Sequence, residues 1–227
     1  MNNLPDYSWL RAVVFDFDGT LVSAPYKDFS KMHARAREAL LPFVDIPHAL
    51  TGPVLEDIER LCSGLEPQTA GMAKNAAMRA IEEVEIETAS LCQVFPFVLP
   101  MLAFLKARDI AVGIITRNCK GAVLTAFPDV EEHFGCILTR EDVKKVKPHP
   151  SHLLTALKIL GCSPEACLMV GDHPMDIQTG KQAGSRTAGV TGEGTHALRL
   201  AEEEPDFLAQ DAGEVMQIIF EKGFEAI

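Results

Sequence analysis

The stretch from Arg11 to Thr20 constrains the fold more than any other part of this chain. It reads R-A-V-V-F-D-F-D-G-T, so an apolar, β-branched run ends in two carboxylates, Asp16 and Asp18. A continuous apolar run is typical of a strand buried on both faces of a parallel sheet, and we expect a strand over residues 12–17. Because side chains alternate along a strand, the two carboxylates project to the same side.

Two readings of this carboxylate pair stay open from the stretch alone. Side-by-side carboxylates repel each other unless a cation or a proton lies between them, which favours a metal site or acid–base chemistry. An Asp-Gly pair after a strand, here Asp18-Gly19, is equally typical of a hairpin turn. The rest of the chain has to decide between them.

The sequence after residue 96 alternates between apolar runs and amphipathic segments, a pattern typical of βαβ units with a parallel sheet. We expect further strands over residues 109–116, 135–139, 166–170, 186–190 and 206–209. We expect helices over residues 98–107, 120–126, 151–160, 175–183 and 212–220. The predicted fold class is α/β, with a Rossmann-like parallel sheet core.

The segment between the first two strands is much longer than a minimal crossover between parallel strands, which takes a few tens of residues. Its apolar residues recur at helical spacing and predict helices over residues 26–41, 54–64 and 67–92, the last as one helix or two. We therefore expect a small α-helical cap at residues 22–94, inserted after the first strand of a core made of residues 1–21 and 95–227.

Composition narrows the class of protein and of partner. The formal net charge of -11 over 227 residues argues against a nucleic-acid or anionic-membrane partner, which would favour a basic face. The six cysteines form no C-x-x-C pair and indicate reduced thiols. The first residues lack the pattern of a secretory leader, and the longest apolar stretch, residues 94–105, is too short to span a bilayer. We therefore expect a cytoplasmic protein.

Polar side chains follow several of the predicted strands at the point where each strand ends. In open parallel sheets, ligands bind in the crevice beyond these carboxyl ends. The side chains expected there, besides the first two carboxylates, are Thr116, Lys147, Asp172 and Asp176. Oxygen ligands without Cys or His at fixed spacing suit Mg²⁺, and a threonine and a lysine beside Mg²⁺ suit a phosphate group.

Each of these residues also has a plain structural interpretation. Thr116 and Asp172 are both suitable caps for the helices that follow them. Asp176 fits a solvated helix surface, and Lys147 fits an ordinary loop. Their joint placement at strand ends is what favours a site.

Four motifs in this chain resemble those of the haloacid dehalogenase-like (HAD) hydrolases. D-F-D-G-T-L at residues 16–21 is similar to the family's first motif, and I-I-T-R-N at residues 114–118 to its second. V-K-P-H-P at residues 146–150 resembles the third, and V-G-D-H-P-M-D at residues 170–176 the fourth. The insertion after the first motif resembles the helical cap of the phosphoglycolate phosphatase-like branch.

The resemblance implies a role for each matched residue. Asp16 matches the nucleophile, which would form an aspartyl-phosphate, and Asp18 matches the general acid/base. Thr116 would hydrogen-bond a phosphate oxygen, and Lys147 would neutralise the nucleophile and the transferring group. The further phosphate-binding positions are Gly19 and the backbone N–H groups near Arg117 and Asn118.

The family pattern also implies a Mg²⁺ cofactor and its ligands. The carboxylates of Asp16 and Asp172 and the backbone carbonyl of Asp18 would hold the ion. Asp176 would orient Lys147 or metal-bound water. The implied activity is a Mg²⁺-dependent phosphatase acting on a small organic phosphate monoester, such as a phosphoglycolate-like compound or a sugar phosphate.

Several alternatives remain open at this point. A sugar phosphomutase of the same superfamily tends to carry Glu-Asp at the fourth motif, so Gly171 counts against it, and a haloacid dehalogenase would lack the acid at Asp18. Phosphonate cleavage would use a cap lysine, Lys27 or Lys31, as a Schiff base. A catalytically silent protein that only binds a phosphate ligand is a further alternative.

Other side chains have weaker claims on function. His149 and His152 stand three residues apart, which leaves a zinc site open, and His173 is expected in the site wall. Basic cap residues are expected mainly on solvated helix faces, with one or two as candidates for substrate contact: Lys27, Lys31, Arg35, Lys74 and Arg79. We expect a small phosphorylated metabolite as the partner, no nucleic acid or membrane, and a monomer or weak homodimer.

Overall fold

The computed structural model describes residues 7–24, 30–45, 50, 52–192 and 197–220 of the 227-residue chain. The chain divides into two compact units, one made of Met1–Ala24 with Cys92–Ile227 and the other of Pro25–Leu91. We call the first unit the core and the second the cap. The boundaries therefore fall at residues 24/25 and 91/92, whereas the sequence suggested 21/22 and 94/95.

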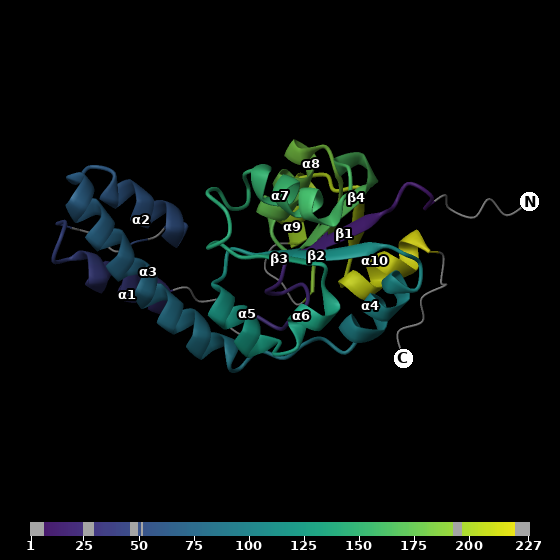
Figure 1. Cartoon of the computed structure of the whole chain (residues 1–227), viewed down its shortest axis with the longest axis horizontal. Helices are drawn as coiled ribbons and strands as arrows, with labels where there is room; N and C mark the ends of the chain where they lie inside the picture. Colours follow the sequence, from purple (N-terminus) through teal and green to yellow (C-terminus); the bar gives the residue numbers. More distant parts are fainter. Residues whose placement is uncertain (1–6, 25–29, 46–49, 51, 193–196, 221–227) are drawn as a thin grey trace, which may run out of the picture. The chain divides into compact units, whose positions relative to one another are not determined.

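The core is built on a six-stranded parallel sheet with the strand order β3-β2-β1-β4-β5-β6 (Figure 1). Every neighbouring pair of strands in it is parallel, which confirms the predicted α/β class. The strands are β1 (Ala12–Phe15), β2 (Ala111–Ile115), β3 (Cys136–Leu138), β4 (Cys167–Gly171), β5 (Arg186–Val190) and β6 (Phe207–Ala209).

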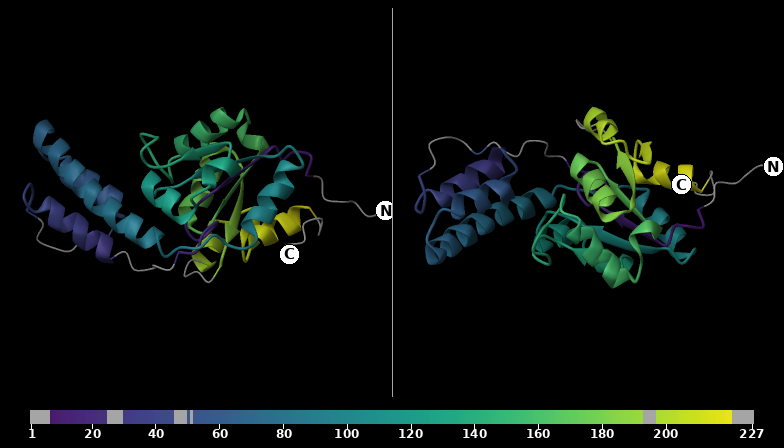
Figure 2. Two further views of the ribbon diagram at one scale, coloured as in Figure 1. Left: turned by 60° about the horizontal axis from the view of Figure 1, so that its bottom comes forward. Right: turned by 90° about the horizontal axis from the view of Figure 1, so that it is seen from above.

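Helices cover both faces of this sheet. Two of them, α7 (Ser151–Leu160) and α8 (Pro174–Ala183), pack on one face against β1–β5. On the other face lie α4 (Val98–Lys106) and α10 (Ala212–Ile219), which also contact each other (Figures 1 and 2). All four residues of β1 are fully buried, because β1 has a strand on each side and helices on both faces.

The sequence missed some short elements and misplaced some ends. The helices α6 (Val130–His133) and α9 (Ala197–Glu202) and the 3₁₀ turn η1 (Pro164–Ala166) were not predicted, because so few residues carry no helical period. The helix α5 (Lys120–Ala126) has the predicted bounds.

Strand β1 ends two residues earlier than predicted, and the chain then turns away from the sheet. Gly19 adopts φ 78°, and its N–H donates to the carbonyl of Val22 at 2.8 Å. Val22 in turn forms an antiparallel bridge with Val94, so the segments that leave and re-enter the core lie side by side. The hairpin alternative for Asp18-Gly19 is therefore wrong, since both partners of β1 run parallel to it.

The described residues of the cap form three helices, α1 (Ser30–Leu40), α2 (Val54–Cys62) and α3 (Pro67–Ala89). The third is one continuous helix, which settles the choice between one helix and two. Apolar residues from all three helices form a separate core, among them Leu40, Ile58 and Ile81. Within the described residues, we find no helix that combines the length and the apolar character needed to span a bilayer.

The cap core offers a stability test within a single helix. Ile81 in α3 is fully buried, whereas Ile86 in the same helix is 36% exposed. We expect Ile81→Ala to lower the free energy of unfolding by about 2–5 kcal/mol, because it opens a cavity in the packed cap. The measurement is urea denaturation followed by circular dichroism. Ile86→Ala serves as the matched control and should cost less than about 1 kcal/mol; equal losses would contradict the assigned packing.

Candidate active site

The candidate site lies at the carboxyl edge of the sheet, where three neighbouring strands end. Asp16 follows β1, Thr116 follows β2 and Asp172 lies just after β4, and β1 is the middle strand of the three. The N–H of Asp16 donates to the carbonyl of Val170 at 2.8 Å, and the N–H of Thr116 donates to that of Leu138 at 3.0 Å. These bonds extend the backbone pairing of the sheet by one residue beyond β1 and β2. They therefore hold the backbone from which the side chains of Asp16 and Thr116 project.

The ammonium group of Lys147 lies between two buried carboxylates. Its Nζ is 2.5 Å from Oδ1 of Asp16 and 2.7 Å from Oδ1 of Asp176. Lys147 is only 2% exposed and Asp176 is fully buried. Burial alone would lower the pKa of Lys147, but the charges of Asp16 and Asp176 outweigh burial and raise that pKa. The lysine therefore remains charged at neutral pH.

The nucleophile candidate is held through only one of its oxygens. Oδ1 of Asp16 accepts hydrogen bonds from Lys147 and, at 2.6 Å, from the N–H of Phe17. Within the described residues, no hydrogen bond reaches its other oxygen, Oδ2. That oxygen remains available to a phosphorus atom or a cation.

Three carboxylates of the site are close enough to share one cation. One oxygen each from Asp16, Asp172 and Asp176 lies within 4.8 Å of the others. Burial, and then the charges of Asp16 and Asp176, raise the pKa of Asp172 well above its ordinary value. Burial likewise raises the pKa of Asp176 to about 7, against the opposing effect of Lys147. This excess of negative charge, carried by oxygen ligands alone, fits a hard divalent cation such as Mg²⁺.

Two glycines make room for these carboxylates. A Cβ atom at Gly19 would collide with the carboxylate of Asp172, and one at Gly171 would collide with the side chain of Asp176. Gly19 also needs its positive φ, which L side chains rarely adopt. These two glycines, one within the first motif and one within the fourth, therefore have a steric role in the site.

Asp18 has different surroundings from Asp16. Its two carboxylate oxygens accept from the side-chain amide Nδ2 of Asn118, at 3.3 Å and 3.2 Å. The amide oxygen of Asn118 is held in turn by the N–H of Cys119 at 2.9 Å. For Asn118 we predicted only a backbone role toward phosphate. Its side-chain contact with Asp18 was not predicted, because no spacing rule links residues 100 positions apart.

Thr116 is oriented for a donor role. Its side chain is 1% exposed, and its Oγ1 accepts from the N–H of Asn118 at 3.0 Å. A hydroxyl that accepts one hydrogen bond still has its proton to donate. That proton is suitable for a phosphate oxygen at the strand edge.

The guanidinium of Arg117 contacts the backbone of Lys147. Its NH1 donates to the backbone carbonyl of Lys147 at 2.7 Å, and the carbonyl of Arg117 accepts from NH1 of Arg140 at 3.3 Å. The backbone N–H groups near Arg117 and Asn118 remain predicted phosphate contacts.

The plain structural alternatives for these residues are wrong. The N-cap of α5 is Cys119, not Thr116, and the N-cap of α8 is His173, not Asp172. Asp176 lies in the first turn of α8, where its Oδ2 accepts from the N–H of His173 at 3.0 Å. It is therefore a buried site residue and not a solvated one.

The zinc hypothesis is also wrong for the described residues. Nδ1 of His149 hydrogen-bonds with Oγ of Ser151 at 2.8 Å, and both ring nitrogens of His152 are taken by backbone groups. His173, expected in the site wall, caps α8 by accepting from the N–H of Met175 at 3.1 Å. Across the described residues, the carboxylate cluster is the only group of three ligating side chains.

Several basic residues of the cap have partners within the cap, so their charges do not need a substrate. Exposed ion pairs join Lys31 to Glu87 (2.6 Å), Arg35 to Glu83 (3.0 Å) and Lys74 to Glu59. Lys31 is 57% exposed, which is unlike the desolvated amine of a Schiff-base enzyme. Lys27, the other candidate for that chemistry, lies outside the described residues.

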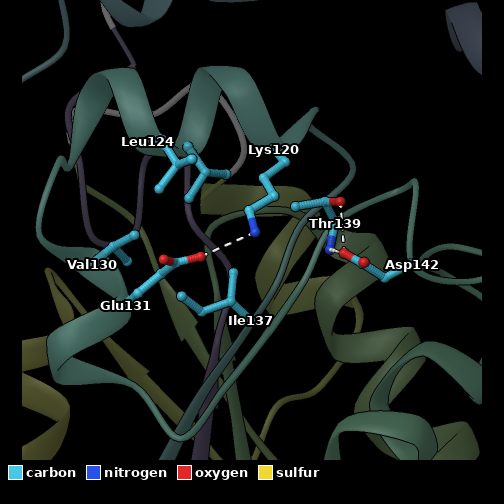
Figure 3. A pocket seen from close by; sticks show the side chains of 8 residues that line it. Lys120, Leu124, Val130, Glu131, Ile137, Thr139 and Asp142 are labelled. Carbon is cyan, nitrogen blue, oxygen red and sulfur yellow. Dashed lines mark hydrogen bonds and ion pairs between the residues drawn. The ribbon is translucent and has the colours of Figure 1, made fainter.

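A separate hollow lies at the outer edge of β3, between α5 and α6 (Figure 3). Its volume is about 60 Å³. Lys120, which lines it, is paired with Glu131 at 3.0 Å, and Asp142 accepts from the N–H and hydroxyl of Thr139 at 2.8 Å. Because its lysine is already neutralised, this hollow is poorly suited to phosphate.

Comparisons with known proteins agree with this geometry. The family model of haloacid dehalogenase-like hydrolases matches residues 10–184, which include every residue of the candidate site. The chain belongs to this family of hydrolases. It is 30% identical to Pyrophosphatase PpaX of Bacillus pumilus over 224 residues, covering 93% of this chain and 97% of that protein.

Solved structures of similar fold also cover nearly the whole chain. One is a predicted phosphoglycolate phosphatase from Haemophilus somnus, with a TM-score of 0.64, 22% identity, and coverage of 92% of this chain and 98% of that one. Another is a β-phosphoglucomutase from Clostridium difficile, with a TM-score of 0.65, 17% identity, and coverage of 94% and 98%. At these identities the two structures establish only the fold of this HAD-like hydrolase.

The crowded carboxylates predict an unusual pH dependence of stability. A raised pKa means that the native state holds a proton that the unfolded state releases above pH of about 3.9. Without a divalent cation, the free energy of unfolding should therefore fall as pH rises from about 4 through 7. Asp172→Asn should flatten this fall and raise the melting temperature at pH near 7, measured in a chelating buffer.

Saturating Mg²⁺ provides the control for this prediction. It should stabilise the wild-type protein more than Asp172→Asn, because the variant has lost a charged ligand. A variant that melts lower than the wild type in the chelating buffer would contradict the assigned repulsion.

Proposed function

We propose that this HAD-like hydrolase is a Mg²⁺-dependent phosphatase that hydrolyses a small organic phosphate monoester through an aspartyl-phosphate. The observation that supports the proposal is the position of the Asp16 carboxylate at the end of β1. Its Oδ1 is 2.5 Å from Nζ of the charged Lys147, and its Oδ2 accepts no hydrogen bond from the described residues. A nucleophile, a cation to neutralise the phosphoryl group and a hydroxyl donor then share one edge of the sheet.

The donor set of the site supports Mg²⁺ as the cofactor. Asp16 and Asp172 would hold it through their carboxylates and Asp18 through its backbone carbonyl. When bound, the ion shields the charge that otherwise keeps an anionic nucleophile from an anionic phosphate. Asp176 belongs to the same cluster, but its Oδ1 is already paired with Lys147, which favours a role in orienting the lysine.

In the first step, Asp16 attacks phosphorus in line with the leaving oxygen. An O–P bond forms to the carboxylate as the ester O–P bond breaks, which gives an aspartyl-phosphate and an alcohol. Lys147 and the hydroxyl of Thr116 face the phosphoryl oxygens and stabilise their charge. Because Oδ1 of Asp16 is held by Phe17 and Lys147, the carboxylate keeps one orientation during attack.

Asp18 moves the protons in both steps. As an acid it gives a proton to the leaving alcohol, and as a base it then takes one from the water that attacks the aspartyl-phosphate. The second step releases inorganic phosphate and regenerates the carboxylate of Asp16. The amide of Asn118 donates to the carboxylate of Asp18 and so orients it for proton transfer.

The substrate class rests on the family and on the named relatives. A relative named as a pyrophosphatase makes inorganic pyrophosphate a candidate beside phosphoglycolate and sugar phosphates. All of these present a terminal phosphoryl group to the same nucleophile. A colorimetric assay of phosphate release across these compounds and nucleoside monophosphates, with Mg²⁺ or a chelator, tests the substrate and the cofactor together.

A phosphomutase is the second candidate, because a β-phosphoglucomutase shares the fold. Gly171 argues against it, since that branch tends to carry glutamate there and a Cβ at this position would collide with Asp176. A mutase would isomerise a sugar phosphate without net release of phosphate. A protein that binds phosphate ligands without turnover would do neither, so one assay of both products separates the three.

The nucleophile assignment has a direct test. We expect Asp16→Asn to lower kcat by at least about 10³-fold, because an amide oxygen is a poor nucleophile for phosphorus. Steady-state kinetics on the best substrate of the panel measures the loss. The matched control is Asp129→Asn, on an exposed side chain of the core, which should keep full activity. Appreciable turnover by well-folded Asp16→Asn would contradict the assignment of Asp16 as the nucleophile.

The proton-transfer assignment predicts an accumulating intermediate. In Asp18→Asn, p-nitrophenyl phosphate should still phosphorylate Asp16, because p-nitrophenolate leaves without a proton. Hydrolysis of the aspartyl-phosphate should slow by about 10²–10⁴-fold, because its general base is lost. Quenched-flow trapping of radiolabelled protein should show label on Asp16. Unlabelled enzyme with unchanged turnover would show that Asp18 has another role.

A further inference from the structure

His152 is a buried histidine that the phosphatase mechanism does not use. It is the second residue of α7 and fully buried, on the same helix face as Leu153, Ala156 and Leu157. Burial, and then the charge of Lys147, lower the pKa of His152 to about 4. At neutral pH the imidazole is therefore neutral, with one nitrogen that donates and one that accepts.

The backbone partners of His152 fix which nitrogen does which. The N–H of Lys147 donates to Nδ1 at 3.3 Å, so Nδ1 carries no proton. Nε2 is 3.2 Å from the carbonyl of Leu138, which can only accept, so Nε2 carries the proton and donates it. The ring thus connects the backbone of Lys147 to Leu138 at the end of β3.

The carbonyl of Leu138 is a shared anchor for two residues of the site. It accepts from the N–H of Thr116 at 3.0 Å as well as from His152. The phosphate-facing Thr116 and the charged Lys147 are therefore tied to the same backbone atom, the first directly and the second through the imidazole.

The other polar group of the Lys147 backbone is also held by a side chain. Its carbonyl accepts from NH1 of Arg117 at 2.7 Å. Arg117 directly follows Thr116, so both attachments of Lys147 lead back to the ends of β2 and β3. The long lysine side chain then starts from a fixed point and reaches Asp16 and Asp176.

We propose that His152 is a positioning residue, whose neutral ring sets the backbone of Lys147 relative to Thr116 and so places the ammonium beside Asp16. This inference rests on the proposed phosphatase function. A displacement of about 1 Å of a catalytic group can cost about 10²-fold in rate, so a single bridging hydrogen bond has a measurable effect.

Two amide variants separate the two hydrogen bonds of the ring. In His152→Asn, the amide oxygen can take the place of Nδ1 and accept from Lys147, while the bond to Leu138 is lost. In His152→Gln, the longer side chain puts its amide nitrogen near the place of Nε2, so it keeps Leu138 and loses Lys147. Both variants are neutral, polar and smaller than or similar in size to histidine.

The proposal predicts unequal effects on turnover. His152→Gln should lower kcat by about 10- to 100-fold with KM changed by less than about 3-fold, because the charge stays present but misplaced. His152→Asn should keep kcat within about 3-fold of the wild type. Assays run well below both melting temperatures, measured by differential scanning fluorimetry. Equal losses of kcat in the two variants would overturn the proposal and leave His152 as a packing residue.

A spectroscopic readout keeps this test separate from the phosphatase proposal. If the wild type turns over no phosphate compound, the proposed function fails, and the ring is judged by nitrogen NMR alone. The expected spectrum shows His152 with the proton on Nε2, and faster hydrogen exchange of the Lys147 amide in His152→Gln than in His152→Asn. The opposite tautomer, or equal exchange in both variants, would overturn the positioning role.

Discussion

The structure of the site depends on one buried ion pair network, in which the ammonium of Lys147 bridges Asp16 and Asp176. A lysine that is 2% exposed is costly to bury unless its charge is paired and hydrogen-bonded. Two carboxylates meet that requirement at 2.5 Å and 2.7 Å. The same pairing holds Asp16 in one orientation, so the interaction that stabilises the buried lysine also orients the proposed nucleophile.

The carboxylates that neutralise the lysine also repel the neighbouring carboxylate of Asp172. Asp172 lies beside them and forms no ion pair with any described residue, and its pKa is raised by burial and by the charges of its neighbours. Gly19 and Gly171 permit this crowding, because a side chain at either position would push a carboxylate away. This crowding of negative charge disfavours the folded state, and the proposed Mg²⁺ would offset it.

The sequence predicted the sheet, the cap and the strand-end residues because each rests on local signals. Buried strands are continuous apolar runs, and Thr116 and Asp172 stand directly at the ends of such runs. The amide of Asn118 on Asp18 could not be predicted, because its 100-residue separation carries no periodicity. His152 did leave a signal: a histidine among Leu153, Ala156 and Leu157 has to be buried, and buried imidazoles are hydrogen-bonded. Its hydrogen-bond partners, Lys147 and Leu138, could be identified only from the three-dimensional structure.

Asp16 and Asp18 are two residues apart, yet the structure gives them different surroundings. Asp16 is buried, with one oxygen held by Phe17 and by a lysine ammonium. Asp18 is half-buried and accepts hydrogen bonds from the neutral amide of Asn118. This ion pair and hydrogen bond hold the Asp16 carboxylate in one orientation, which suits the nucleophilic role proposed for it. Lys147 pairs with Asp16 and Asp176 but not with Asp18, so Asp18 is not needed to neutralise the lysine and suits the separate proton-transfer role proposed for it.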